Sequence, residues 1–262
     1  WLFPTSAPLD VVGAEKVWVF NPGDTDVQVR VQVQLDEPGV NGTVEPFEQN
    51  VPAHRAVPIT IIDSDDDPAN DRVPKGVPHW VLVQSTDGAD IVAQRMLTGT
   101  DLRGVSYAIG IPVVATRWLL PVAGAAAVGS SLVAVANPSA TETATVTLRR
   151  QGGGSVSDVE SAIEIPPGEF RMLDLVRAGL TEGAMSAEVV SDHPVVVGQW
   201  IGFSSPSDIA TPLGIPVVGT LGLPFDLIAP GVASGELDTA PLPSDDTLVD
   251  PASVPTETTP EG

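Results

Sequence analysis

The sequence predicts an all-β protein built from two tandem antiparallel β-sandwiches, followed by a disordered acidic tail. Three observations lead to this fold class. The 262 residues include 25 glycines and 26 prolines, which divide the chain into many short elements. Aliphatic and polar residues alternate along several segments, as in strands that turn one face to a core and the other to water. A series of short motifs also occurs twice in the same order, which indicates a duplication.

The duplication is clearest in Gly110-Ile111-Pro112-Val113-Val114, which returns unchanged at 214–218. The other matching segments, in chain order, are 1–4 with 118–121, 17–22 with 133–138, 51–53 with 165–168, and 91–94 with 196–199. The offset between the copies falls before the fourth pair, so we expect an insertion in the first copy there. We predict one domain at 1–116 and a second at 117–230, each long enough to bury its own core.

The strand at 27–35 is the first element to assign, because its valines alternate with Gln and Arg. Segment 144–149 shows the same alternation in the second copy. β-Branched residues and flanking turn residues predict the remaining strands, at 16–21, 56–62, 80–85, 90–96, 104–109, 131–137, 155–165, 170–175, 186–191 and 195–203. Short strands without intervening amphipathic helices favour sandwiches of immunoglobulin-like type over a parallel sheet.

Three further segments complete the assignment. Gly152-Gly153-Gly154 joins two strand patterns and predicts a hairpin turn, and 173–180 predicts one short helical turn. Residues 231–262 contain acids and prolines but no basic or aromatic residue. Such a segment cannot bury enough apolar area to offset the entropy of ordering, so we expect a disordered tail.

The turns of both copies share a further pattern. An Asn-Pro turn follows a strand at Asn21-Pro22 and at Asn137-Pro138, and Val-Pro-Ala or Pro-Pro-Gly follows at 51–53 and 166–168, before a Pro-Val-Val-Val strand at 194–197. This pattern resembles a repeat of secreted or envelope proteins of actinobacteria, a family of unknown function with tandem immunoglobulin-like β-sandwiches. The resemblance covers roughly residues 1–220. It implies an exported location and supplies no catalytic residues.

The charge balance restricts the partners. The chain has 34 Asp and Glu against 12 Lys and Arg, a formal net charge of −22. Nucleic acid and anionic membranes bind cationic faces, so we expect neither as a partner. The chain contains no cysteine, which excludes disulfides, thiol catalysis and cysteine-ligated metals.

One uncharged run, 118–136, is near the length that spans a bilayer. Pro121 and the many small residues in the run argue against a membrane helix. The equivalent stretch of the first copy contains charged residues, so a span would give homologous units different topologies. We therefore expect no transmembrane segment within these residues.

The segment 63–71 is rich in aspartate and lies in the insertion of the first copy. Oxygen ligands at alternating positions suit Ca²⁺, so Asp63, Asp65, Asp67 and Asp71 are the candidate ligands. The EF-hand pattern is not met, because Pro68 stands where its turn glycine would be. The other interpretation, which we favour, is a solvated acidic loop that protects strand edges from pairing.

The tryptophans and histidines give weak indications of a site. Trp1 and Trp118 occupy equivalent places in the two copies and are the candidates for a glycan-stacking platform. Core or half-buried packing is the interpretation that we favour for the tryptophans as a group. The histidines lack metal-ligand spacing, so we expect surface positions in turns for His54, His79 and His193.

The chain contains no nucleophile elbow, metalloprotease helix motif or phosphate loop. We therefore expect a non-catalytic extracellular or cell-envelope module, acting as a spacer or in adhesion, with a protein or a cell-surface polymer as partner. One alternative is a binding module for glycan or Ca²⁺, and no other cofactor is expected. A third is a hydrolase that uses a carboxylate pair, an arrangement defined in space rather than by sequence spacing.

Overall fold

The computed structural model describes residues 1–4, 12–36, 44–64, 67, 69, 71–100, 104–123, 128–152, 155–175, 185–203, 209–211 and 214–217. These residues form antiparallel β-sheets and contain no α-helix, so the all-β prediction is confirmed. Within the same residues, no helix is long and apolar enough to cross a membrane. The tail predicted at 231–262 lies outside the described residues.

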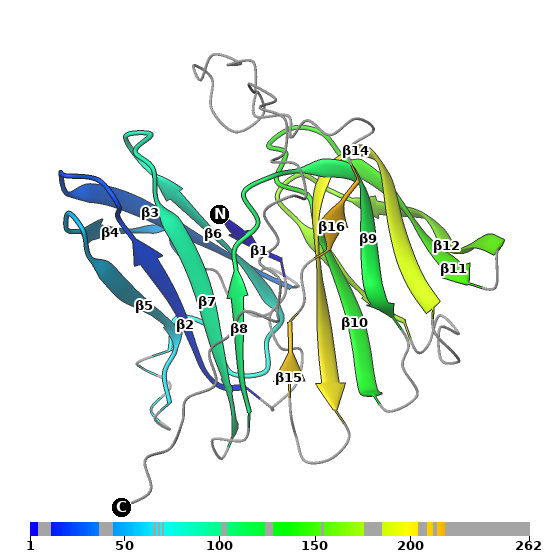
Figure 1. Ribbon diagram of the computed structural model, residues 1–262, viewed down its shortest axis with the longest axis horizontal. Coiled ribbons are helices and arrows are strands. Elements are labelled where there is room, and N and C mark those ends of the chain that lie inside the picture. Colours follow the sequence, from blue (N-terminus) through cyan, green and yellow to red (C-terminus); the bar gives the residue numbers. More distant parts are fainter. Residues whose placement is uncertain are drawn as a thin grey trace, which may run out of the picture.

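The first half of the chain contains eight strands in two sheets (Figure 1). They are β1 (Leu2–Phe3), β2 (Val12–Phe20), β3 (Val27–Leu35), β4 (Phe47–Val51), β5 (Ala56–Ile62), β6 (His79–Ser85), β7 (Val92–Gly99) and β8 (Val105–Ile109). Sheet A has the order β1-β6-β3-β4, and sheet B has the order β5-β2-β7-β8. The alternating valines of β3 and those of β2 belong to one buried cluster, so the apolar faces of the two sheets face each other.

The second half forms a single eight-stranded network through which β14 runs. Its strands are β9 (Ala115–Ala123), β10 (Val128–Ala136), β11 (Ala144–Gly152), β12 (Ser155–Ile165), β13 (Phe170–Asp174), β14 (Met185–Phe203), β15 (Ile209–Ala210) and β16 (Ile215–Pro216). The first part of β14 pairs with β9 and β11, and its last part pairs with β10 and β15. We call the part of the network around the start of β14 sheet C and the part around its end sheet D.

The two halves have the same strand order. Sheet C, with β9-β14-β11-β12, corresponds to β1-β6-β3-β4, and sheet D, with β13-β10-β14-β15, corresponds to β5-β2-β7-β8. The long β14 therefore corresponds to both β6 and β7 of the first half. Its pairing with β9 shifts register between Val190 and Val195, around the Asp192-His193-Pro194 segment, where the first half has a turn between two strands.

The pairing register corrects one of the sequence matches. Val17 pairs with Arg95 in the first half, and the equivalent Val133 pairs with Gln199 in the second. Gln199 therefore corresponds to Arg95 and not to Gln94, with which the sequence match aligned it. A shift of one residue matters because it moves a side chain from one face of the sheet to the other.

A buried asparagine organises the same turn in each half. The Nδ2 atom of Asn21 donates to two backbone carbonyls at 2.7 and 3.0 Å, and its Oδ1 accepts a backbone N–H at 2.9 Å. Asn137 makes the same set of bonds at 2.7, 2.9 and 3.0 Å. The partners are Thr25, Val51 and Gly23 for Asn21, and Glu142, Ile165 and Ser139 for Asn137. Each Asn-Pro turn is thus tied to the end of a strand in the opposite sheet.

Most predicted strands are present, but several elements differ from the prediction. The two strands predicted at 186–191 and 195–203 form the single strand β14, and the two-residue strands β1, β15 and β16 were not predicted. The strands β4 and β9 were not expected, because neither shows a clean alternation of apolar and polar residues. Residues 173 and 174 belong to β13 instead of a helical turn, and 176–184 lie outside the described residues. Gly152 pairs with Ser155, as in a hairpin, although the turn residues themselves are not described.

The two halves are joined by a buried interface as well as by the chain. Leu2 and Trp80 of the first half belong to the buried cluster of the second half, and Trp200 of the second half belongs to the cluster of the first. The hydroxyls of Ser106 and Thr211 are 2.9 Å apart and buried. In Figure 1, β8 and β15 lie side by side at this junction. The halves therefore hold each other in one arrangement.

Candidate functional site

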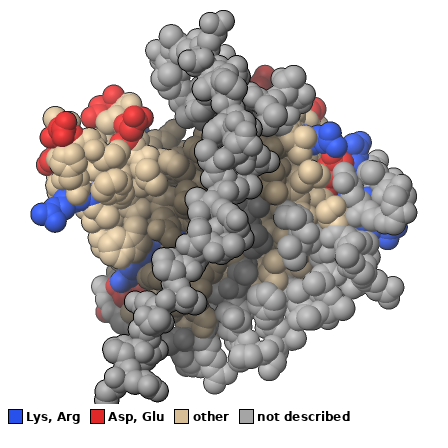
Figure 2. Space-filling model, in the orientation of Figure 1, with Lys and Arg blue, Asp and Glu red and all other residues tan. Residues whose placement is uncertain are grey.

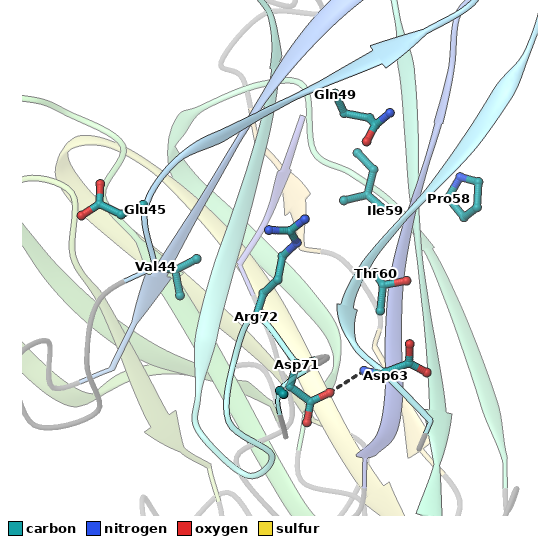
Figure 3. Close-up of a pocket in the computed structure, with 10 residues that line it drawn as sticks. Val44, Glu45, Gln49, Pro58, Ile59, Thr60, Asp63, Asp71 and Arg72 are labelled. Atoms are coloured by element: carbon teal, nitrogen blue, oxygen red, sulfur yellow. Dashed lines mark hydrogen bonds between the residues drawn. The ribbon is translucent and has the colours of Figure 1, made fainter. Parts of the chain in front are cut away.

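An open hollow beside β4 and β5 is lined in part by described residues of the aspartate-rich segment 63–71 (Figure 3). Its volume is about 720 Å³, and Thr60, Asp63, Asp71 and Arg72 contribute to its lining. The guanidinium of Arg72 extends away from the two carboxylates, and its Cζ lies 3.7 Å from the centre of the Phe47 ring. Arg72 is thus placed for a cation–π contact at the edge of sheet A.

The described carboxylates of this loop face backbone donors. Oδ1 of Asp71 accepts the N–H of Asp63 at 2.6 Å, and Oδ1 atoms of Asp63 and Asp67 accept N–H groups of nearby residues at 2.6 and 3.0 Å. Asp65 lies outside the described residues. Ca²⁺ needs six or more converging oxygens, and the described part of the chain holds no group of three or more acidic, His or Cys side chains that could bind a metal. The assignment of Ca²⁺ to Asp63, Asp65, Asp67 and Asp71 stays a prediction.

Trp1 and Trp118 occupy equivalent positions in space as they do in sequence. Nε1 of Trp1 donates to the carbonyl of Ile91 at 2.7 Å, and Nε1 of Trp118 donates to that of Val195 at 3.1 Å. Trp1 is half-buried, whereas Trp118 is fully buried. A sugar stacks on an exposed ring face, which Trp118 does not offer, so we build no glycan site on it.

The expectation of core or half-buried packing holds for Trp1, Trp80, Trp118 and Trp200, whereas Trp18 is the most exposed of the five tryptophans. The Trp18 side chain is 38 % exposed. Its neighbours Val17 and Val19 enter the core, and successive side chains of a strand point to opposite faces. Trp18 therefore lies on the outer face of sheet B.

The histidines also differ from the expectation in one case. His54 is exposed and His193 is partly exposed, as surface positions require. His79 is fully buried at the start of β6, where Nε2 lies 3.1 Å from Oε2 of Glu15. Nδ1 of His79 lies 2.9 Å from the carbonyl oxygen of Val77. His79 is thus part of the core and not a turn residue.

Glu15, His79 and Arg95 form a buried charged cluster, which we call the ionic triad. All three side chains are shielded from solvent, and Nη1 of Arg95 lies 3.9 Å from Oε1 of Glu15. Burial raises the pKa of the Glu15 carboxyl, but the charge and hydrogen bond of His79 and the charge of Arg95 outweigh it, and the net shift lowers the pKa. Burial lowers the pKa of Arg95, and the charge of Glu15 opposes this shift without cancelling it.

The second half has a neutral version of this cluster. By the strand register, Ser131 corresponds to Glu15 and Gln199 to Arg95, and Nε2 of Gln199 donates to Oγ of Ser131 at 3.0 Å. The same core position thus accepts either charges or a neutral hydrogen bond. The ionic triad lies away from solvent, so it suits a structural role better than the binding of a soluble ligand.

The outer face of sheet B is the most distinctive surface of the described chain. Trp18 pairs with Pro58 on one side and Gln94 on the other, and Gln94 pairs with Ile109. Residues opposite each other in antiparallel strands lie on one face with adjacent side chains, so these rows form a continuous surface. Apart from Ile215, the exposed large hydrophobic residues of the described chain all lie here: Trp18, Phe20, Val92, Val105, Tyr107 and Ile109.

The same face is poor in charge. Lys16 is the charged residue among its outward-pointing described side chains, in a chain whose net charge is −22. In Figure 2 the part of the first half that no grey atoms cover is mainly tan, and acidic side chains gather at one end. Asp24, Asp26, Asp87 and Asp90 are exposed in the turns that follow β2 and β6. The apolar centre is therefore bordered by acidic loops.

Several large apolar side chains of this surface are unusually exposed. Tyr107 and Ile109 are 60 % and 56 % exposed, values unusual for large apolar side chains on strands. Contiguous exposed apolar patches on soluble proteins mark sites of interaction, and aromatic residues contribute most to binding energy at such sites. We call this surface, centred on Trp18, Phe20, Tyr107 and Ile109, the sheet B face.

Comparison with known proteins gives no functional assignment. No family model matches the chain, and no curated protein matches it. Among solved structures, one described as "Crystal Structure of Thermotoga maritima 1070" is 19 % identical in sequence. The match covers 39 % of this chain and 95 % of that chain, with a TM-score of 0.33.

Proposed function

We propose that the chain is a non-catalytic interaction module of the cell envelope or the extracellular space, and that it binds through the sheet B face. The observation that carries the proposal is the concentration of exposed aromatic and aliphatic side chains on this one face. We further propose that each half is an immunoglobulin-like β-sandwich, with domains at 1–116 and 117–230. The core shared by sheets A and B supports this architecture.

The interface between the halves supports a spacer role. Trp80 and Trp200 each belong to the buried cluster of the other half, and the hydrogen bond between Ser106 and Thr211 is also buried. A flexible linker would leave the two halves free to rotate, whereas this interface fixes their arrangement. The module thus presents the sheet B face in a constant orientation relative to the second half.

One observation favours the glycan-binding alternative as a second candidate function. Trp18, Phe20 and Tyr107 are exposed aromatic rings on the same face of one sheet, and Gln94 next to Trp18 offers a hydrogen-bonding amide. A sugar ring could stack on the aromatics while its hydroxyls bond to that amide. This candidate uses the same face, with Trp18 in the place that the sequence suggested for Trp1 and Trp118.

The experiment measures binding of the purified chain to envelope fragments of the source organism, to a glycan array and to itself. Trp18→Ser/Tyr107→Ser removes two large rings from the face, and we expect it to reduce whichever binding is found on the order of tenfold. Gln28→Ser/Arg30→Ser is the matched control, because these exposed residues lie on the outer face of sheet A. Wild-type binding that the Trp18 variant leaves unchanged, or no binding to any of the three, would reject the proposed function.

A further inference from the structure

The outer face of sheet D, which corresponds to the sheet B face, is covered by the first half. In β2 the exposed positions alternate with buried ones at Trp18 and Phe20, as expected for a sheet with one face in water. In β10 the residues from Val133 to Ala136 are all buried, and in β14 the residues from Val195 to Ile201 are all buried. Burial without alternation means that both faces of sheet D are covered.

The residues that cover sheet D come from one side of the first half. Leu2, Trp80, Ile111 and Val113 all belong to the buried cluster of the second half. Leu2 and Ile111 face each other in an antiparallel bridge, and they are only 3 % and 5 % exposed. We call this side of the first half, which is built on β1 and the segment after β8, the β1 side.

The sheet B face repeats the covered face of sheet D position by position. The strand register places Trp18 where sheet D has Ala134, and Phe20 where it has Ala136. Val92 corresponds to the buried Val196. The sheet B face is thus the equivalent of a surface that is buried between the halves, and its side chains at Trp18 and Phe20 are larger than those of sheet D. No part of the described chain covers it.

The second half has its own version of the β1 side. Leu119 pairs with Ile215 through β9 and β16, as Leu2 pairs with Ile111. Ile215 is 53 % exposed, whereas the equivalent Ile111 is 5 % exposed. Ile215 is also the one exposed large hydrophobic residue of the described chain that lies outside the sheet B face. The exposed apolar residues therefore fall on two surfaces that are the equivalents of the two sides of the internal interface.

We propose that a second copy of this chain binds head to tail, with its Leu119–Ile215 surface against the sheet B face. The inference rests on the proposed function, because it takes the sheet B face as the docking surface and names what docks there. The two contacting surfaces differ, so the association is heterologous and leaves one free surface of each kind at the ends of every assembly. Further copies then bind in a row, in the same way that the first half packs against the second within one chain.

Size and charge set the conditions for this association. Trp18 and Phe20 are larger than Ala134 and Ala136, so the incoming copy sits farther out and rests on the aromatic rings. Each copy carries a net charge of −22, so copies repel one another at low ionic strength. Added salt screens this repulsion and strengthens hydrophobic contact. We therefore expect association that rises with salt, opposite to a contact held by ion pairs.

Sedimentation velocity of the complete 262-residue chain tests the proposal. We expect a series of oligomers that grows with concentration and salt. Trp18→Ser/Phe20→Ser removes one contacting surface and Ile215→Ser removes the other, and each is expected to weaken association on the order of tenfold. These side chains are exposed, so circular dichroism and thermal melting should show that both variants stay folded. Gln28→Ser/Arg30→Ser should associate like the wild type.

Mixing the two variants gives the sharpest readout. The Ile215→Ser chain keeps its sheet B face and the Trp18→Ser/Phe20→Ser chain keeps its Leu119–Ile215 surface, so the mixture should form dimers but nothing larger. If two sheet B faces instead pair with each other, association is lost in the Trp18→Ser/Phe20→Ser variant but is unchanged in the Ile215→Ser variant. That result would overturn the head-to-tail arrangement. A monomeric wild type whose Trp18-dependent binding is to glycans or envelope fragments would also overturn it, while leaving the proposed function supported.

Discussion

Nε2 of His79 lies 3.1 Å from Oε2 of Glu15 inside the core of the first half, and both side chains are shielded from solvent. Arg95 completes the ionic triad from the adjacent strand β7. Removing one partner of a buried ionic cluster leaves the others desolvated and uncompensated, at a cost of about 3–5 kcal/mol. We expect Glu15→Ser to lower the free energy of unfolding by that amount in urea denaturation.

The second half supplies the matched control for this experiment. Ser131, Met185 and Gln199 stand at the positions equivalent to Glu15, His79 and Arg95. The variant Glu15→Ser/His79→Met/Arg95→Gln replaces the whole cluster together, so that no charged side chain is left buried without its partner. The triple variant should therefore be more stable than the single one. A triple variant as unstable as Glu15→Ser would show that the charges hold the fold.

The ionic triad also predicts how stability depends on pH. The pKa of Glu15 in the folded chain is lowered from its ordinary value of 4.5, because the effects of His79 and Arg95 exceed that of burial. A carboxyl with a lowered folded pKa contributes stability above its unfolded pKa, and this contribution is lost as the pH falls through the folded pKa. We expect the wild type to lose stability on acidification below about pH 4.5 more steeply than the triple variant.

Urea denaturation of both proteins between neutral and acid pH measures this difference. The stability of the triple variant should still fall on acidification, but less than that of the wild type, because other carboxyls also have lowered pKa values. A hydrogen bond from Ser85 lowers the pKa of Asp87, and one from the backbone N–H of Thr145 lowers that of Asp192. Parallel curves for the two proteins would mean that Glu15 contributes nothing to acid sensitivity.

The strands could be predicted from the sequence where alternation is clean, and the site could be predicted only in part. The valines of β3 fixed both the strand and its buried face. The same period, applied to Val17 and Val19, places Trp18 on the outer face, but the apolar content of the segment favoured core packing for it. The ionic triad could not be predicted, because Glu15 and Arg95 meet only through the pairing of β2 with β7, distant in sequence.

A left-handed backbone conformation at His54 gives a third prediction. His54 has φ of 56°, and the equivalent position of the second half is Gly168 with φ of 74°. The preceding turns match, because the N–H of Arg55 bonds to Pro52 and that of Glu169 bonds to Pro166, both at 3.1 Å. A side chain in this region costs about 1 kcal/mol or more, whereas glycine adopts it freely.

We expect His54→Gly to raise the free energy of unfolding by about 0.5 kcal/mol, because the larger unfolded-state entropy of glycine offsets part of the relieved strain. The exposed pair that His54 forms with Asp24 contributes little. Gly168→Ala is the reciprocal change, and it should lower stability by about 1 kcal/mol. A Cβ at Gly168 meets no atom within 4 Å, so strain and not a clash would be responsible. If both substitutions raised the free energy of unfolding, or both lowered it, this explanation would be excluded.

The paired asparagines test how strongly the two halves depend on each other. Asn21→Ala and Asn137→Ala each remove the side chain that satisfies two buried carbonyls and one backbone N–H of a turn. Each change should cost about 2–4 kcal/mol. Asn50, an exposed residue bonded to Asp26, is the control, and Asn50→Ala should change stability by less than about 0.5 kcal/mol.

Trp80 and Trp200 are each buried in the cluster of the opposite half, so unfolding one half exposes apolar surface of the other. Asn21→Ala and Asn137→Ala, although they lie in different halves, should therefore shift one and the same calorimetric transition to lower temperature. Two transitions, of which each variant moves only its own, would mean that the interface is too weak to couple the halves. In that case the fixed orientation of the sheet B face would also be lost, and with it the basis for a rigid spacer.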